Sequence, residues 1–181
     1  WVVMRNGTSL ITKDGGLTWK QKTSDLSARI RQVQFRNHTE AWGIDENGSV
    51  FITHNQGMTW EASVIRRGSG ADRQRGGGGG RENRGGGQLV ADVHFINDQQ
   101  GWAVGRGAHI YHTADGGKTW GLQLGSRGLD HLRNVLFLTN QTGWISGDNG
   151  LLLETQDGGQ TWMPLQSGTR QTLVGLHFPS L

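Results

Sequence analysis

The chain has 181 residues, a formal net charge of +3 and no cysteine. The lack of cysteine excludes disulfides and thiolate chemistry, and no apolar run reaches the roughly 18 residues that a membrane-spanning helix needs. Glycine is abundant, at 31 residues, whereas only 33% of the residues are hydrophobic. Such a composition favours a fold with many turns and a small core.

The eight tryptophans of the chain form four pairs, and within every pair the second tryptophan follows the first by 18 residues. The four pairs are Trp1/Trp19, Trp42/Trp60, Trp102/Trp120 and Trp144/Trp162. Self-similarity at a fixed period is typical of repeat architectures. The chain is therefore interpreted as tandem copies of one unit.

The second tryptophan of each pair ends the pattern T-x-[DN]-x-G-x-T-W. A short Asp or Asn side chain can accept hydrogen bonds from the backbone of its own turn, and Gly supplies a positive φ there. We therefore predict four hairpin turns with a structural role. Their key residues are Asp14, Gly16, Trp19, Asn55, Gly57, Trp60, Asp115, Gly117, Trp120, Asp157, Gly159 and Trp162. One isolated carboxylate per copy does not make a cation site, so neither a metal nor another cofactor is expected.

A second turn precedes each of these boxes, at Asn6-Gly7, Asn47-Gly48, Gly107-Ala108 and Asn149-Gly150. Asn-Gly between apolar runs is a strong hairpin signal. Another strand is predicted before the first tryptophan of a copy, ending on Phe35, Phe95 or Phe137. Four short strands per copy predict an all-β fold, a β-propeller with four-stranded antiparallel blades of about 41 residues.

In chain order, the predicted blades are residues 1–25, which lack a first strand, then 26–65, 89–128 and 129–168. Residues 169–181 would begin the next blade, since Leu173 to Phe178 repeats the first-strand pattern. The whole of 1–181 is thus expected to be one segment of a larger propeller, of roughly six to eight blades.

Residues 66–87 are a Gly/Arg-rich insertion in one inter-blade loop, without strand character. In a propeller these loops and the Asn-Gly turns emerge on one face, here called the loop face, while the boxes emerge on the opposite box face. Basic residues of the loop face form our predicted partner-binding surface. They are Arg29, Arg31, Arg66, Arg67, Arg73, Arg75, Arg81, Arg84, Arg106, Arg133 and Arg170. Such a surface suits an anionic partner, but the insertion has no aromatic residue for base stacking, which disfavours nucleic acid.

The boxes resemble the Asp-box, or bacterial neuraminidase repeat. The arrangement from Gly101-Trp102 to Trp120, and again from Gly143-Trp144 to Trp162, is similar to the photosystem II stability and assembly factor family. The resemblance implies a non-catalytic scaffold in the periplasm or thylakoid lumen, peripheral to the membrane, that docks on protein subunits of a membrane complex. Asn55-Gln56 departs from the usual Asp-Gly, and the insertion is not a recognised family feature.

The sequence is also compatible with two other functions. A glycan-binding or sialidase-like module of a secreted hydrolase would need a tyrosine nucleophile with an acidic partner. The one tyrosine, Tyr111, stands where other copies have Leu10, Phe51 and Leu153, so it is predicted to be a core residue. No catalytic residue is therefore assigned. The third possibility is a structural array in a surface layer or filament.

Overall fold

The structure is a computed structural model that describes residues 1–66, 90–125 and 130–178. Its regular elements are β-strands, apart from two short 3-10 turns, η1 (Arg106–Ala108) and η2 (Asp148–Gly150). Within those described ranges, no helix is long and apolar enough to cross a membrane. The prediction of an all-β fold is confirmed.

The strands form four sheets, which we number as blades 1 to 4. Blade 1 contains β1 (Val2–Val3), β2 (Ser9–Ile11) and β3 (Lys20–Lys22). Blade 2 contains β4 (Ile30–Phe35), β5 (Ala41–Asp45), β6 (Val50–Thr53) and β7 (Glu61–Ala62). Blade 3 contains β9 (Val90–Phe95), β10 (Gly101–Gly105), β11 (Ile110–Thr113), β12 (Thr119–Leu124) and β8 (Val64–Arg66). Blade 4 contains β13 (Leu132–Phe137), β14 (Gly143–Gly147), β15 (Leu152–Thr155) and β16 (Met163–Pro164).

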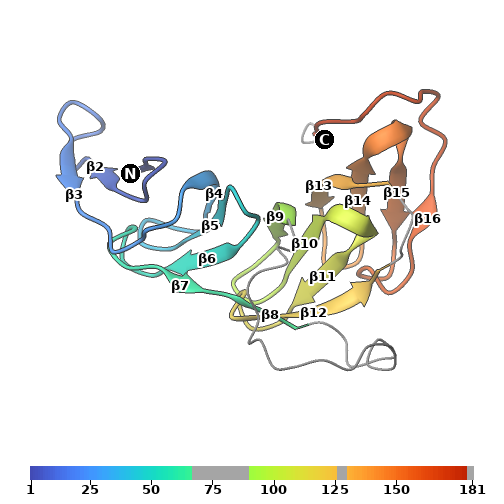
Figure 1. Ribbon diagram of the computed structural model, residues 1–181, viewed down its shortest axis with the longest axis horizontal. Helices are drawn as coiled ribbons and strands as arrows, with labels where there is room; N and C mark the ends of the chain where they lie inside the picture. The colour runs from blue at the N-terminus through green and yellow to red at the C-terminus, as the bar shows by residue number, and fades with distance from the viewer. Residues whose placement is uncertain (67–89, 126–129, 179–181) are drawn as a thin grey trace, which may run out of the picture.

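The blades follow one another along an open curve (Figure 1). Strands β4, β9 and β13 line its inner side, and β7, β8, β12 and β16 lie on the outside. Within each blade, consecutive strands pair antiparallel, as in the register Trp102↔His112 between β10 and β11. The described chain is thus a segment of a β-propeller whose first strands face the axis.

Strand β8 differs from the sequence-based expectation. The sequence predicts residues 64 and 65 as the end of blade 2 and residue 66 as the start of the insertion, but all three pair parallel with β12, in the register Val64↔Thr119 to Arg66↔Gly121. The Val64 N–H also donates to the Lys118 carbonyl oxygen, at 3.0 Å. After β7 the chain therefore crosses to the outer edge of blade 3 and covers an edge strand whose backbone groups would otherwise lie unpaired.

No strand is assigned to the described part of the last segment, residues 169–178. A strand needs a hydrogen-bonded neighbour, and none of the described strands pairs with these residues. The segment nevertheless lies against blade 4, because the Leu173 N–H donates to the Gly147 carbonyl oxygen at 3.0 Å and the Phe178 ring lies 4.4 Å from the Trp144 ring. Beyond Arg66, the predicted insertion lies outside the described residues.

Aromatic residues join one blade to the next. The Trp42 ring of blade 2 stacks on Phe95 of blade 3, with ring centroids 3.6 Å apart, and Trp102 of blade 3 stacks on Phe137 of blade 4 at the same distance. Each indole N–H also crosses the boundary, from Trp42 to the Gly116 carbonyl oxygen at 3.0 Å and from Trp102 to that of Gly158 at 3.3 Å. The first tryptophan of a copy therefore belongs to an inter-blade contact.

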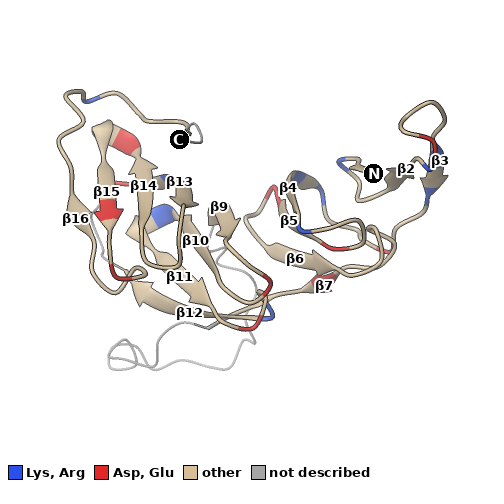
Figure 2. Ribbon diagram, turned by 180° about the vertical axis from the view of Figure 1, so that it is seen from behind, with Lys and Arg blue, Asp and Glu red and all other residues tan. Residues whose placement is uncertain are grey.

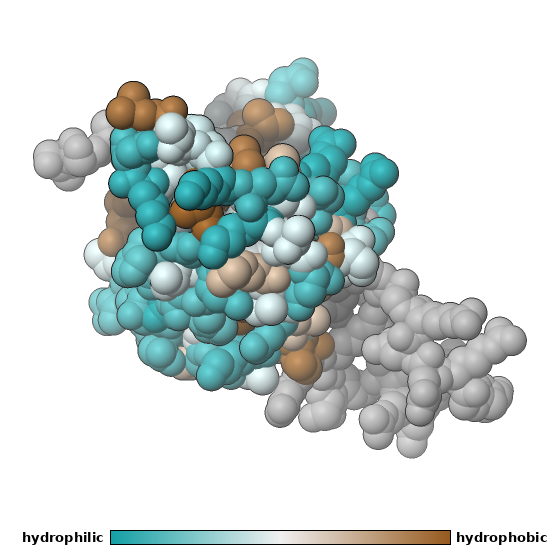
Figure 3. All heavy atoms as spheres, turned by 90° about the vertical axis from the view of Figure 1, so that its left-hand side faces the viewer, coloured by the Kyte–Doolittle hydropathy of each residue, from teal (hydrophilic) through white to brown (hydrophobic). Residues whose placement is uncertain are grey.

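The boundary between blades 1 and 2 is packed less closely. Trp1 meets Phe35 edge-on, with centroids 4.6 Å apart, and Phe35 is 46% exposed, against 3% for Phe137. In blades 3 and 4 the box tryptophan lies edge-on to the phenylalanine that ends its own first strand. Blade 1 has no such strand among residues 1–66, and Trp19 is 45% exposed. Figure 3 faces this end and shows apolar residues separated by hydrophilic ones.

A buried carboxylate ties three first strands together near the axis. Asp92 on β9 accepts hydrogen bonds from the Gln32 amide of blade 2, at 2.5 Å, and from the Val135 backbone N–H of blade 4, at 3.1 Å. Its side chain also accepts from the N–H of Val93, at 2.9 Å. All of these donors are supplied by the fold itself, so the buried carboxyl oxygens have the hydrogen-bond partners that burial requires.

We expect Phe137→Ala to destabilise the protein by about 3–5 kcal/mol, because it leaves a cavity between two blades. The matched change Phe35→Ala should cost less than about 1.5 kcal/mol, since that ring is already half in solvent. Chemical denaturation of both variants, followed by tryptophan fluorescence, measures the difference. Equal losses of unfolding free energy would contradict the assignment of Phe137 to the inter-blade core.

Candidate functional site: a basic hollow on the loop face

A hollow of about 310 Å³ lies where the first strands of three blades begin. It is lined by Arg31, Glu46, Val90, Ala91, Arg106, His131, Leu132 and Arg133. Arg31 comes from blade 2, Arg106 from the turn after β10 in blade 3, and Arg133 from blade 4. Three of the predicted partner-binding arginines are therefore brought together at the axis, on the loop face.

Two of the three arginines are fixed by the fold. The Arg31 side chain donates to the Asp45 carbonyl oxygen at 3.1 Å, and across the blade boundary to those of Val90 and Ala91, at 2.6 and 2.9 Å. Arg133 forms a two-point pair with Asp148, with Nε to Oδ1 at 2.7 Å and Nη2 to Oδ2 at 3.1 Å. The acceptors of Arg31 are neutral backbone carbonyl groups, whereas the acceptor of Arg133 is a carboxylate that balances much of its charge.

The pairing of Arg133 with Asp148 shifts the pKa values of both groups. The hydrogen bond from Arg133 lowers the pKa of the Asp148 carboxyl, and the same contact raises the pKa of Arg133. The aspartate therefore stays ionised at any neutral pH. Figure 2 shows basic and acidic segments close together around β13 and β14.

Arg106 is the arginine of the hollow that is available to a ligand. Its guanidinium has no hydrogen bond or ion pair to any residue within the described ranges, and the side chain is exposed. Glu46 contributes a negative charge to the lining, but its carboxylate lies 3.7 Å from Arg5. The arrangement can hold an anionic or hydrogen-bond-accepting group between Arg31 and Arg106.

The remaining predicted arginines lie elsewhere. Arg29 is exposed just before β4, outside the lining of the hollow. Arg170 lines a separate hollow of about 410 Å³, formed by Gly150 and residues 165–170. Arg66 ends β8 on the outer rim of blade 3. Arg67, Arg73, Arg75, Arg81 and Arg84 lie outside the described residues.

Sequence reasoning missed Glu46 and His131 as neighbours of the predicted arginines. The repeat register contained a usable signal, because Arg31, Ala91 and Arg133 each hold the second position of a first strand. Residues at one register position of successive first strands converge at the axis. Aligning the copies on these strands would have located the hollow.

The boxes form closed hydrogen-bond networks rather than ligand sites. In every copy the box threonine hydroxyl accepts from the N–H of the box glycine at 2.9 Å, the glycines being Gly16, Gly57, Gly117 and Gly159. The Asp or Asn side chain accepts from the N–H of the second threonine, also at 2.9 Å. In the divergent copy, Asn55 uses its amide to donate to the Thr59 hydroxyl at 2.7 Å.

Gln56, the other residue of that divergent box, has a φ of 62° where the equivalent glycines have values near 72°. Its amide donates to the His38 carbonyl oxygen at 3.0 Å. The turn therefore keeps its left-handed geometry with a residue that rarely adopts it.

The described ranges contain no group of three or more His, Asp or Glu residues that could hold a metal ion. Tyr111 is 1% exposed and belongs to the core cluster of blades 2 and 3. A tyrosine buried in this way is not accessible to a glycoside substrate.

Comparison with known families gives the fold a context. Residues 85–173 match the family model described as photosynthesis system II assembly factor YCF48. Over this stretch, which is just under half of its length, the chain is similar to that family. The curated photosystem II assembly protein Ycf48 of Synechococcus sp. (strain JA-2-3B'a(2-13)) is 29% identical over 103 residues, which are 57% of this chain and 26% of that protein.

Solved structures agree with the fold. A structure titled YCF48 from Cyanidioschyzon merolae superposes with a TM-score of 0.69 at 16% identity, covering 97% of this chain and 59% of the other. One of YCF48 bound to a D1 peptide gives 0.60 at 21% identity, covering 88% and 43%. An ancestral GH74 enzyme gives 0.57 at 14% identity, covering 96% and 23%. The chain thus spans a quarter to about three fifths of these proteins, as a partial match to larger propellers.

We expect the carboxyl of Asp157 to titrate at about 2, below the usual value of about 3.9, because the Thr161 hydroxyl and N–H both donate to its ionised form. Removing the hydroxyl in Thr161→Val should raise this pKa toward the usual value. Carboxyl ¹³C NMR during an acid titration measures both. The stabilisation is present above pH 4 and is lost as the pH falls through the folded pKa.

Asp14 serves as an internal control, since its pKa is also lowered to about 2 by its own threonine, Thr18. Its titration should be the same in Thr161→Val as in the unmodified protein. An unchanged Asp157 titration in that variant would show that the threonine hydroxyl does not hold the box carboxylate.

Proposed function

We propose that this chain is part of a non-catalytic propeller that docks on a membrane-associated protein complex as an assembly or stability factor, in the manner of photosystem II assembly factors. The YCF48-family match over residues 85–173 supports this proposal. By analogy with that family the protein would act outside the cytoplasm, in the thylakoid lumen or periplasm, peripheral to the membrane.

The observation that carries the proposal is the convergence of Arg31, Arg106 and Arg133 from three blades on one hollow. Two of these side chains are held in place before any partner arrives, which reduces the entropic cost of binding. Neighbouring guanidinium groups suit the carboxylates or carbonyl groups of a peptide segment. A YCF48 structure with a bound D1 peptide shows that a related propeller accepts a peptide.

The other predicted arginines extend the proposed surface. Arg29 lies just before β4 and Arg170 lines the second hollow beside Gly150. With Arg66 and the insertion arginines Arg67, Arg73, Arg75, Arg81 and Arg84, they would supply further positive charge. Charges at the rim of an interface mainly raise the association rate and its dependence on salt. The hollow itself is proposed to fix the position of the partner segment.

We expect Arg106→Gln to weaken binding of a D1 peptide about 3- to 10-fold, because it removes the exposed cation of the hollow that has no ion-pair partner among the described residues. Isothermal titration calorimetry at constant ionic strength measures the dissociation constant. Lys118→Gln is the matched control, since it removes one exposed cation from the box face of the same blade. Equal weakening by the two variants, or none by Arg106→Gln, would contradict docking at the hollow.

A further inference from the structure

The boundary between blades 2 and 3 and the boundary between blades 3 and 4 have the same aromatic contact, but they differ in a residue next to it. At both boundaries a tryptophan stacks on the phenylalanine of the next blade. The residue that follows the first strand of the earlier blade is Arg36 at the boundary of blades 2 and 3, and Ile96 at the boundary of blades 3 and 4. Ile96 packs against the hydrophobic cluster that includes Phe137 of blade 4. The equivalent position is thus apolar at one boundary and charged at the other.

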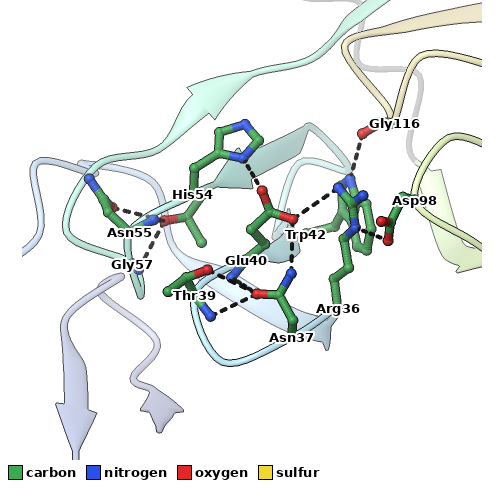
Figure 4. Close-up of polar contacts among 11 residues, drawn as sticks. Arg36, Asn37, Thr39, Glu40, Trp42, His54, Asn55, Gly57, Asp98 and Gly116 are labelled. Carbon is green, nitrogen blue, oxygen red and sulfur yellow. Dashed lines mark hydrogen bonds and ion pairs between the residues drawn. The ribbon is translucent and has the colours of Figure 1, made fainter.

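Arg36 connects blade 2 to blade 3 by an ion pair. Its Nε contacts an Asp98 carboxylate oxygen, in the turn between β9 and β10 of blade 3. Its Nη1 lies 2.9 Å from Glu40, and its guanidinium carbon lies 5.7 Å from the centre of the Trp42 ring. Figure 4 shows Arg36 beside Trp42, between Glu40 and Asp98. One cation therefore holds the turns of two blades together on the box face.

Two neighbours hold Glu40 in position. His54 Nδ1 lies 2.8 Å from Glu40 Oε1, and the Asn37 amide donates to Oε2 at 3.1 Å. The Glu40 side chain is 24% exposed and that of Arg36 is 17% exposed, whereas the Asp98 side chain is 71% exposed. On the blade 2 side, Arg36 and Glu40 are thus held in place and partly buried, whereas the Asp98 carboxylate of blade 3 is exposed to solvent.

Rising salt should weaken the boundary between blades 2 and 3 but not the boundary between blades 3 and 4. The Debye length falls from about 10 Å at 0.1 M salt to about 3 Å at 1 M, so an ion pair with an exposed member is weakened as salt rises. An apolar contact such as that of Ile96 is not weakened in this way. The loop-face side of the blade 2–blade 3 boundary depends on hydrogen bonds from Arg31 to backbone carbonyls, so the response should be localised to the box face.

We propose that the Arg36–Asp98 contact is a salt-sensitive clasp that closes the box-face side of the boundary between blades 2 and 3, while the boundary between blades 3 and 4 has no such response. Opening of the clasp releases the guanidinium that lies over the Trp42 ring and makes it easier to break the hydrogen bond from the Trp42 indole N–H to the Gly116 carbonyl oxygen of blade 3. The propeller would then open more readily at this one boundary when ionic strength rises.

The two boundary tryptophans provide matched reporters. Trp42 and Trp102 are 3% and 1% exposed, and each donates its indole N–H to a box carbonyl oxygen of the following blade. Hydrogen exchange of these two protons can be followed by ¹⁵N NMR in the full-length protein. Between about 0.05 and 0.5 M NaCl we expect exchange at Trp42 to accelerate about two- to five-fold relative to Trp102.

Variants separate the clasp from general effects of salt. Asp98→Asn changes an exposed turn residue and should give fast exchange at Trp42 that no longer depends on salt. Arg36→Ile, which copies the residue at position 96, should remove the salt dependence as well. Arg5→Gln breaks a different exposed ion pair, that of Arg5 with Glu46, and should retain the wild-type response at Trp42.

The proposal is overturned if Trp42 and Trp102 respond equally to salt in the unmodified protein. It is also overturned if Asp98→Asn keeps the full salt response. Should Arg36→Ile fail to fold, Asp98→Asn decides alone, because its side chain is largely in solvent.

Discussion

The architecture depends on one contact between neighbouring blades, in which a tryptophan stacks on the phenylalanine that ends the next first strand. The same indole donates its N–H to a carbonyl oxygen in the box of that next blade. The three recurring elements of the copy, namely the first tryptophan, the phenylalanine and the box, thus meet across a boundary. Each copy is completed by its neighbour, as expected of repeats that cannot bury their apolar faces alone.

This contact also determines where a ligand can bind. Stacking each blade on the next brings the starts of β4, β9 and β13 together, so that side chains at equivalent positions of different blades become neighbours. Arg31 and Arg133 lie near each other for this reason, although 102 positions separate them in the chain. Because the boxes occupy the opposite face, their carboxylates do not neutralise the hollow.

The sequence was sufficient for the fold because the signals were local and repeated. Phe35, Phe95 and Phe137 end their strands as predicted. The direction in which Trp42 and Trp102 point could not be derived, since their partners lie 53 and 35 positions away. Strand β8 was not foreseen either, because three residues carry no pattern and its partner β12 follows the insertion. For the site, residue types were predictable, but the pairing of Arg133 with Asp148 required the geometry.

Repetition of the boundary contact leaves neighbouring positions free to vary. Both boundaries keep the stacked rings although the residue after the first strand is Arg36 at one and Ile96 at the other. In a repeat array the stability is approximately a sum of unit and boundary terms. A charged residue at one boundary therefore changes the response of that boundary to its surroundings and leaves the others as they were. In a propeller of this kind, the shared pattern therefore determines the fold, and the residues that differ among copies determine how each boundary responds to its surroundings.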